Sequence, residues 1–369
     1  MEAGLARPHF PSLDGLRCLA ILPVIWHHST TRPMEGLLGR GPIGVELFFA
    51  LSGFLITSLL LHEKKSGPIA LGAFWLRRSL RIFPLYYVVL GAFVLHALFV
   101  RPAGPVRDHF LDTVPYYATY TSNWFSYKAV DHAIVFAFAW SLAAEEQFYL
   151  LWPPILRALG GVARPAIAMA VLVLLDQSAE RGWLSFLDEG LVLRMLRSFA
   201  TPIGLGALLA LANDHPKSSR VLRLALGQRW SSVLALAAVV IALVRPWTIF
   251  ETHLALVALV GSCALRRDHL LAPLFEHRAL RHVGTVSYGM YLLNVPVVSL
   301  VRGVLGAEAN ALLVFALATA ASIGFATLTY RWIERPFLAL RDRARLRAVC
   351  IEPTRTKIEA SSSPVTSGS

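Results

Sequence analysis

The sequence predicts an all-α polytopic membrane protein with about ten transmembrane helices, because of its composition and its regularly spaced apolar segments. Of 369 residues, 56% are hydrophobic and 16% are charged, and the mean hydropathy is +0.56. Soluble domains are about 45–50% apolar and about 25% charged. Segments near the roughly 17–25 residues of a membrane-spanning helix recur along the chain. We expect spans at 13–29, 42–61, 80–101, 138–157, 162–176, 191–211, 230–246, 252–266, 283–304 and 309–331.

The loops between these segments carry the charges that predict their orientation. Lysine and arginine gather in the loops after the second, fourth, sixth and eighth spans, at Lys64, Lys65, Arg77, Arg78, Arg157, Arg164, Lys217, Arg220, Arg223, Arg229, Arg266, Arg267, Arg278 and Arg281. The opposite loops are poorer in basic residues or are acidic. Because basic loops stay in the cytoplasm, we expect both termini to be cytoplasmic.

The segment 109–125 does not fit as an eleventh span, because a further crossing would reverse every later loop. Its Tyr and Trp residues suit the membrane–water boundary, so we expect a re-entrant or interfacial element there. Residues 1–340 then form one integral-membrane domain. Residues 341–369 are expected to be a cytoplasmic tail that begins basic and ends in a disordered stretch.

Charge and cysteine content exclude two other classes of function. The formal charge of +12 does not indicate nucleic-acid binding, because the basic residues are distributed over the loops and do not form one patch. The three cysteines form neither a CxxC pair nor a cluster with histidine. We therefore expect no metal site.

Ionisable residues interrupt the apolar helices and are candidates for a functional site. Arg17 and His28 are eleven positions apart, so they share one helix face at a separation of about 16 Å. Glu46 opens the second span, and Glu145 and Glu146 lie in the fourth. His28, Glu46 and one of the two glutamates could share a depth, and a carboxylate near a histidine prepares it as a general base. The alternative is structural: Arg17 reaches the membrane surface, His28 packs as a neutral side chain, and the carboxylates form ion pairs that hold the bundle together.

A second basic pattern, RRSLR at 77–81, enters the third span from the cytoplasmic side. Arg78 and Arg81 are three positions apart and face the same way on a helix, and Arg17 is expected at the same level. Guanidinium groups bind phosphate through two parallel hydrogen bonds. The functional interpretation is a clamp for an anionic cytosolic ligand, and the alternative is a set of anchors that only fix topology.

Six motifs in a fixed order resemble a known family. They are LDGLR with a histidine eleven residues after its arginine, GVELFFALSGFLIT, RRSLRIFPLYY, WSLAAEEQFYLLWP, SYGMYLLNVP and YRWIERPF. Over residues 10 to about 340, the chain resembles the membrane acyltransferase family 3, the bacterial O-acyltransferases that modify lipopolysaccharide, exopolysaccharides, Nod factors and macrolides.

The resemblance implies a ten-helix, multi-pass enzyme of the inner (plasma) membrane. It would transfer an acyl group, acetyl by default, from cytosolic acyl-CoA to a hydroxyl of a carbohydrate or glycosylated acceptor. The family's residues correspond here to Arg17 and His28 of the first helix, the pair Arg78 and Arg81, the fourth-helix carboxylate Glu145, and Glu46 at the acidic position of GV(D/E)LFF.

From this resemblance we expect His28 to act as a general base or transient acyl carrier, oriented by Glu145 or Glu46. The three arginines would hold the phosphates of the CoA donor. A tetrahedral oxyanion also needs hydrogen-bond donors. The candidates are Asn123, Tyr149, Tyr288 and Asn294.

Two departures from the family pattern matter. Asn294 stands where many members have a histidine, so no second catalytic histidine is expected from the ninth helix. Members fused to an extracellular SGNH esterase domain are longer, so we expect the chemistry of this chain to lie in its membrane domain. The rival hypothesis is a transporter or flippase of a lipid-linked sugar, with histidine and glutamate as a proton relay. Paired half-repeats with broken helices, which are typical of transporters, are not apparent in the sequence.

Overall fold

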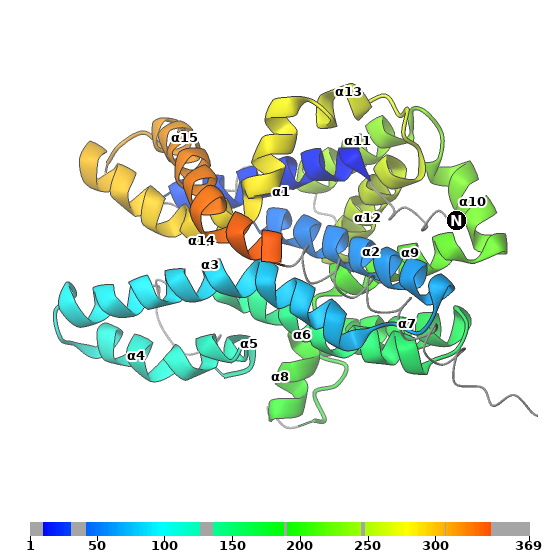
Figure 1. The fold of residues 1–369 in the computed structure, drawn as a ribbon, viewed down its shortest axis with the longest axis horizontal. Helices are drawn as coiled ribbons and strands as arrows, with labels where there is room; N and C mark the ends of the chain where they lie inside the picture. The colour runs from blue at the N-terminus through cyan, green and yellow to red at the C-terminus, as the bar shows by residue number, and fades with distance from the viewer. Residues whose placement is uncertain are drawn as a thin grey trace, which may run out of the picture.

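Within the residues that the computed structural model describes, 10–30, 42–125, 136–187, 190–244, 248–306 and 308–340, every regular element is a helix (Figure 1). The helices are α1 (Pro11–Ser29), α2 (Ile43–Ser66), α3 (Leu71–Phe99), α4 (Pro105–Ala118), α5 (Ser122–Phe125), α6 (Ala139–Ala158), α7 (Ala163–Glu180), α8 (Leu191–Arg197), α9 (Thr201–Asp214), α10 (Pro216–Leu226), α11 (Ser231–Val244), α12 (Ile249–Leu265), α13 (Ala272–Phe275), α14 (Arg278–Leu305), α15 (Ala311–Thr329) and the π-helical turn η2 (Tyr330–Glu334). The tail expected at 341–369 lies outside the described residues.

Each of the ten ranges expected as a span contains helix. Among the described residues, four helices are long and apolar enough to cross a membrane: α2, α3, α14, and α15 with its continuation to Leu340. If each of two bent helix pairs is one span, the number rises to six. The all-α class is confirmed for the described residues, whereas ten spans and cytoplasmic termini stay predictions.

One of the expected spans contains a bend, and a second bend lies where an expected loop meets the span at 230–246. The range 191–211 contains α8 and α9, which meet at an angle of 58°. Pro202 lies in the first turn of α9, where proline suits a helix start but cannot continue an existing helix. The second bend, of 75°, separates α10 from α11. These two breaks are neighbours in the sequence and do not lie at matching positions of two half-repeats.

Helix α4, which follows α3, is too short to cross a membrane. It has 14 residues, fewer than the roughly 17 that a span requires. It packs along α3, where the hydroxyl groups of Tyr86 and Tyr87 donate to the backbone carbonyls of Tyr117 and Ala118, each at 2.8 Å. The expectation of a non-spanning element at 109–125 agrees with this length.

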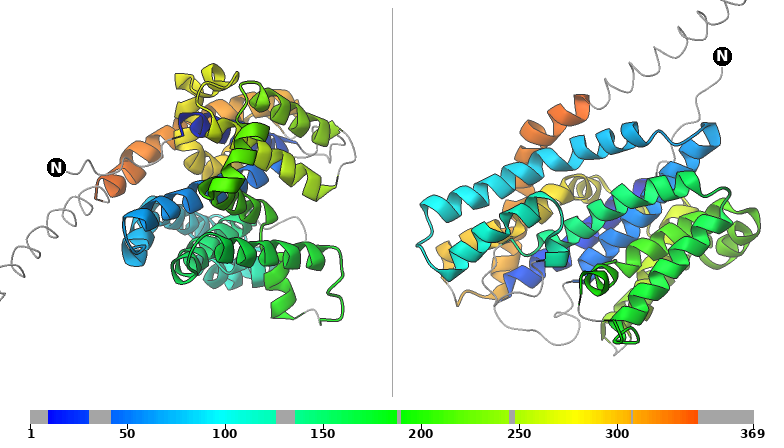
Figure 2. Two further views of the ribbon diagram at one scale, coloured as in Figure 1. Left: turned by 90° about the vertical axis from the view of Figure 1, so that its right-hand side faces the viewer. Right: turned by 90° about the horizontal axis from the view of Figure 1, so that it is seen from below.

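Helices α1 and α2 lie in the interior and position the site (Figure 2). One apolar cluster joins α1 to α3, α6, α14 and α15, a second joins α1 and α2 to α9, α11 and α12, and a third joins α2 to α3, α6, α7 and α9. Glycine allows the closest of these approaches. A Cβ atom at Gly53 of α2 would lie 1.9 Å from the carbonyl oxygen of Ile203 in α9, and one at Gly206 would lie 2.3 Å from that of Ala50.

Candidate active site

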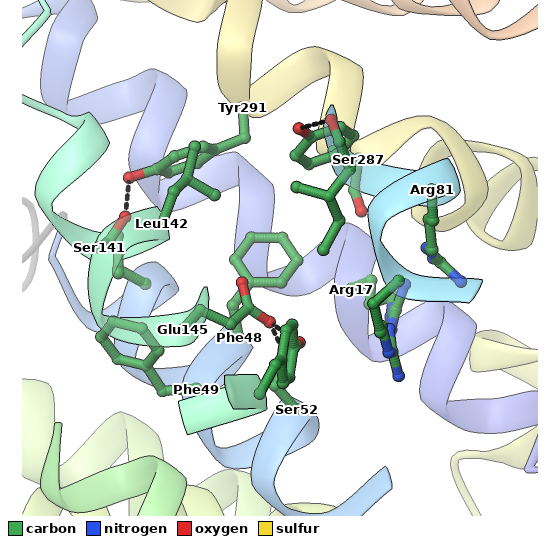
Figure 3. A pocket seen from close by; sticks show the side chains of 15 residues that line it. Arg17, Phe48, Phe49, Ser52, Arg81, Ser141, Leu142, Glu145, Ser287 and Tyr291 are labelled. Carbon is green, nitrogen blue, oxygen red and sulfur yellow. Dashed lines mark hydrogen bonds between the residues drawn. The ribbon is translucent and has the colours of Figure 1, made fainter. Parts of the chain in front are cut away.

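A cavity opens where α1, α2, α3, α6 and α14 meet (Figure 3). Its volume is about 80 Å³, which is room for several water-sized groups. Phe48, Phe49 and Leu142 supply apolar wall, and hydroxyl groups come from serine and tyrosine side chains. Four of the six predicted site residues line this one cavity: Arg17, Arg78, Arg81 and Glu145.

Three arginine side chains meet on one side of the cavity. Arg17 comes from α1, and Arg78 and Arg81 come from one face of α3. All three are half-buried, and none forms an ion pair with another of the residues that the structure describes. By contrast, Arg77 pairs with Glu63 at 3.2 Å. Half-buried cations that form no ion pair are costly, so this side of the cavity is suited to an anionic ligand.

Arg78 is held in place by an aromatic ring. Its guanidinium carbon lies 4.9 Å from the centroid of the Tyr149 ring, a cation–π contact of about 0.5–2 kcal/mol. The indole nitrogen of Trp75 donates to the backbone carbonyl of Tyr149 at 3.1 Å, which ties α3 to α6. The contact fixes the direction of the arginine and leaves its N–H donors for a ligand.

Glu145 lines the cavity, and two hydroxyl groups donate hydrogen bonds to its carboxylate. Its Oε1 accepts hydrogen bonds from Ser52 of α2 and from Tyr149, one turn further along α6. Glu146, the next residue, does not line the cavity. Its Oε1 is buried without a hydrogen-bond partner among the described residues. The structure therefore distinguishes two glutamates between which helix geometry alone did not choose.

The wall opposite the arginines carries further hydroxyl groups. The side-chain oxygens of Ser141 and Tyr291 lie 2.6 Å apart, and Tyr291 also donates to the carbonyl of Phe138 at 3.0 Å. Tyr288 donates to the carbonyl of Ile82 at 2.7 Å. Figure 3 shows Ser141 and Tyr291 across the cavity from Arg17 and Arg81. Ser141 and Tyr291 thus lie away from the guanidinium groups, whereas the Tyr288 hydroxyl contacts α3 next to Arg81.

The other two predicted residues lie elsewhere. Glu46 contacts His253 of α12, with 3.5 Å between Oε2 and Nε2. His28 is half-buried near the end of α1, where its ring centroid lies 5.4 Å from that of His27. No hydrogen bond or ion pair within the described residues joins His28 to Glu46 or Glu145. The expected pairing of His28 with a carboxylate is therefore not observed here.

The four residues expected to stabilise an oxyanion each donate one hydrogen bond within the protein. The Asn123 amide donates to Gln147 at 3.0 Å, and the Asn294 amide donates to the carbonyl of Tyr291. Tyr149 donates to Glu145, and Tyr288 donates to a backbone carbonyl. Each tyrosine has one O–H and would have to exchange its partner before it could bind a reacting oxygen, whereas each amide nitrogen has a second N–H.

The expectations from sequence gave no role to Glu334, although it lies in the quoted motif YRWIERPF. The structure places it in η2, with 5% of its surface exposed and with Oε1 unpartnered among the described residues. Arg81 lies within electrostatic range. Single π-helical turns occur often at functional sites. An acidic residue in an otherwise apolar and basic motif was the available signal.

Comparison with known sequences assigns the chain to a family. Residues 10–331 match the family model described as an acyltransferase domain. The chain belongs to the acyltransferase 3 family. Across the described residues of this family member, no group of three or more His, Cys, Asp or Glu side chains is arranged to hold a metal ion.

Curated relatives of this acyltransferase 3 chain are named as O-acetyltransferases. Peptidoglycan O-acetyltransferase OatA of Listeria monocytogenes is 30% identical over 355 residues, which cover 90% of this chain and 56% of the relative. "Putative peptidoglycan O-acetyltransferase YrhL" of Bacillus subtilis is 29% identical over 93% of this chain and 57% of the relative. The chain thus spans a little over half the length of these relatives. No solved structure matches it.

Proposed function

We propose that the protein is a membrane O-acetyltransferase that moves an acetyl group from cytosolic acetyl-CoA to a hydroxyl of a carbohydrate. Family membership supports acyl transfer, and the names of the relatives support acetyl as the group and a glycan such as peptidoglycan as the acceptor. The observation that carries the proposal is the set of three arginines around one cavity, without ion-pair partners among the described residues.

The arginine side of the cavity is proposed as the site for the CoA phosphates. Phosphate groups are the strongly anionic part of an acyl-CoA, and guanidinium groups bind them with charge-assisted hydrogen bonds of about 1.5–3 kcal/mol each. Arg78 and Arg81 approach from one helix and Arg17 from another, so a phosphate between them would be contacted from two directions. In the predicted topology all three residues lie toward the cytoplasm, where acyl-CoA is made.

His28 is proposed as the general base or transient acyl carrier, at a distance from the phosphate site. It shares a face of α1 with Arg17, and eleven residues of helix separate the two by about 16 Å. An acyl-CoA has its phosphates and its thioester at opposite ends of an extended pantetheine arm. A donor anchored at Arg17 can therefore present its thioester further along α1, toward His28.

The chemistry follows from these positions. If His28 acts as the base, it accepts the proton of the acceptor hydroxyl, whose oxygen attacks the thioester carbon. The C–O bond forms, the C–S bond breaks, and the CoA thiolate leaves and takes up a proton. A well-placed base contributes about 10² to 10⁴ in rate. Glu145 is proposed to position Tyr149 and hence Arg78, since its carboxylate accepts the Tyr149 hydroxyl.

The proposal is tested by acetyl transfer in membranes that contain the full chain. Isotope-labelled acetyl-CoA and a muropeptide acceptor should give labelled O-acetyl ester, and mass spectrometry of wall glycans from cells with and without the gene should show one acetyl group lost per modified sugar. Equal acetyl content of all glycans with and without the gene would contradict the carbohydrate acceptor. Unchanged acetyl-CoA binding after removal of all three arginines would contradict the donor site.

A further inference from the structure

Helix α10 presents an apolar surface that no other described element covers. None of its residues Pro216–Leu226 is buried. The side chains of Val221 and Leu224 are 65% and 69% exposed, and their positions three apart place them on one helix face. On the inner side, Leu222 and Leu226 pack against the cluster around α9 and α12. The helix is therefore held to the bundle by one face and exposes apolar side chains on the other.

Basic side chains surround this exposed face. Lys217, Arg220 and Arg223 are exposed on α10. Helical geometry puts Lys217 between Val221 and Leu224, with Arg220 and Arg223 along one flank. At the C-terminal end, Trp230 is 53% exposed. We call Lys217, Arg220, Val221, Arg223, Leu224 and Trp230 the α10 surface. Its combination of tryptophan, aliphatic side chains and arginine or lysine is typical of the boundary between a bilayer and water.

The direction of α10 also fits this boundary. It meets α11 at 75°, so if α11 runs along the membrane normal, the 11 residues of α10 rise by only about 4 Å in that direction. Hydrogen bonds fix both ends: Ser218 donates to the carbonyl of Ala212 at 2.7 Å, and Arg266 donates to that of Gly227 at 3.3 Å. Figure 1 places α10 toward the end of the bundle where α1 begins, the predicted cytoplasmic end.

We propose that the α10 surface lies in the headgroup layer of the cytoplasmic leaflet and binds anionic phospholipids. Val221 and Leu224 would enter the outer part of the acyl chains, and Lys217, Arg220 and Arg223 would contact lipid phosphates. The nearby carboxylates have other partners, since Asp214 pairs with Lys65 and Asp268 with Arg266. The positive charge of the surface is thus not neutralised from within. A free inorganic anion would leave the apolar side chains in water, whereas a lipid satisfies both kinds of group.

The proposal is tested on the full chain in nanodiscs with a fluorescent label at position 224. Cys18 and Cys263 are buried, so Leu224→Cys in a Cys350→Ser background offers one accessible thiol for a polarity-sensitive dye. In discs that contain phosphatidylglycerol, a shallow spin-labelled lipid should quench the dye strongly and a water-soluble quencher weakly. In discs of phosphatidylcholine alone, lipid quenching should fall at least twofold. Replacing Lys217, Arg220 and Arg223 by Gln should lower it to the same level in either lipid.

Two controls separate charge from general insertion. Arg220→Lys with Arg223→Lys keeps the charge and should retain the quenching seen in phosphatidylglycerol. Leu234→Cys on α11, 55% exposed, should be quenched by lipid equally in both disc types.

Equal lipid quenching at position 224 in both discs would overturn the anionic lipid as partner. Full access of the water-soluble quencher in phosphatidylglycerol discs would overturn the membrane contact. Protection in native membranes but not in phosphatidylglycerol discs would point to a protein occupant and would also overturn the proposal.

Discussion

Replacement of Arg78 by alanine should weaken the acyl-CoA donor and leave the rest of the reaction almost intact. In the proposed donor site, Arg78 contributes charge-assisted hydrogen bonds to a CoA phosphate, and the Tyr149 ring 4.9 Å away holds its guanidinium in place. Loss of such hydrogen bonds costs about 1.5–3 kcal/mol. We therefore expect the KM for acetyl-CoA to rise about ten- to hundredfold, with a much smaller change in kcat.

Lysine at position 78 should recover part of this loss. It restores the charge but neither the planar fork nor the same stacking on Tyr149, so we expect a KM about three- to tenfold above that of the parent. Added salt should raise the KM of the parent more than that of Arg78→Ala, because screening weakens a contact that the variant no longer has.

The neighbouring arginine provides a matched control. Arg77 pairs with Glu63 and does not line the cavity, and a partly exposed ion pair is worth about 1 kcal/mol or less. Arg77→Ala should change the KM for acetyl-CoA by less than about twofold. Steady-state transfer measured in nanodiscs, with acetyl-CoA and with a short thioester that lacks CoA, distinguishes the cases. Equal losses for both donors in Arg78→Ala, or equal losses in Arg77→Ala and Arg78→Ala, would refute a phosphate contact.

Three further substitutions test other parts of the molecule. His28→Ala should lower kcat by about 10² or more and leave membrane insertion intact. His27 points about 100° away around the helix, so His27→Ala should retain activity. Near-normal turnover in His28→Ala would rule out a chemical role for His28. Glu334→Gln removes a negative charge near Arg81 and should lower the KM for acetyl-CoA about two- to fivefold, while a higher KM would show that the carboxylate positions the arginine instead. Burial lowers the pKa of His269, so the folded state resists its protonation. Thermal stability in detergent should therefore fall as the pH drops below about 6.5, and a His269→Asn variant that kept the same slope would exclude this histidine as the cause.

The sequence was sufficient for the helices and for the shared face of Arg78 and Arg81, because both depend on local periodicity. Apolar length and loop charge located ten helical ranges, and three-residue spacing put Arg78 and Arg81 on one face. Helix boundaries were less accurate: α3 begins at Leu71, nine residues before the expected span at 80–101. Its first turns carry basic residues that a hydropathy window excludes, although they are good helix formers.

The position of Glu145 relative to His28 shows what depth alone cannot predict. The sequence placed both at a similar level in the membrane, but the structure puts Glu145 in the cavity with the arginines. Its two hydroxyl partners explain this. One, Tyr149, is four residues away on the same helix, and the other, Ser52, belongs to α2. Only the packing of α6 against α2 and α3 brings these groups together, and a single sequence contains no record of that packing.

Glu46 illustrates the same limit through the rotation of a helix. On α2, Val45, Phe48, Phe49 and Ser52 line the cavity, and their spacing of three and four residues defines one face. Glu46 lies about 240° from Ser52 around the helix axis and contacts His253 of α12 instead. The sequence predicts how deep a side chain lies in the membrane, which is one of its three coordinates. The direction in which the side chain points around the helix axis depends on which neighbouring helix packs against which face. Because α12 packs beside α2 through the second apolar cluster, the carboxylate at position 46 contacts His253, while Ser52 lines the cavity.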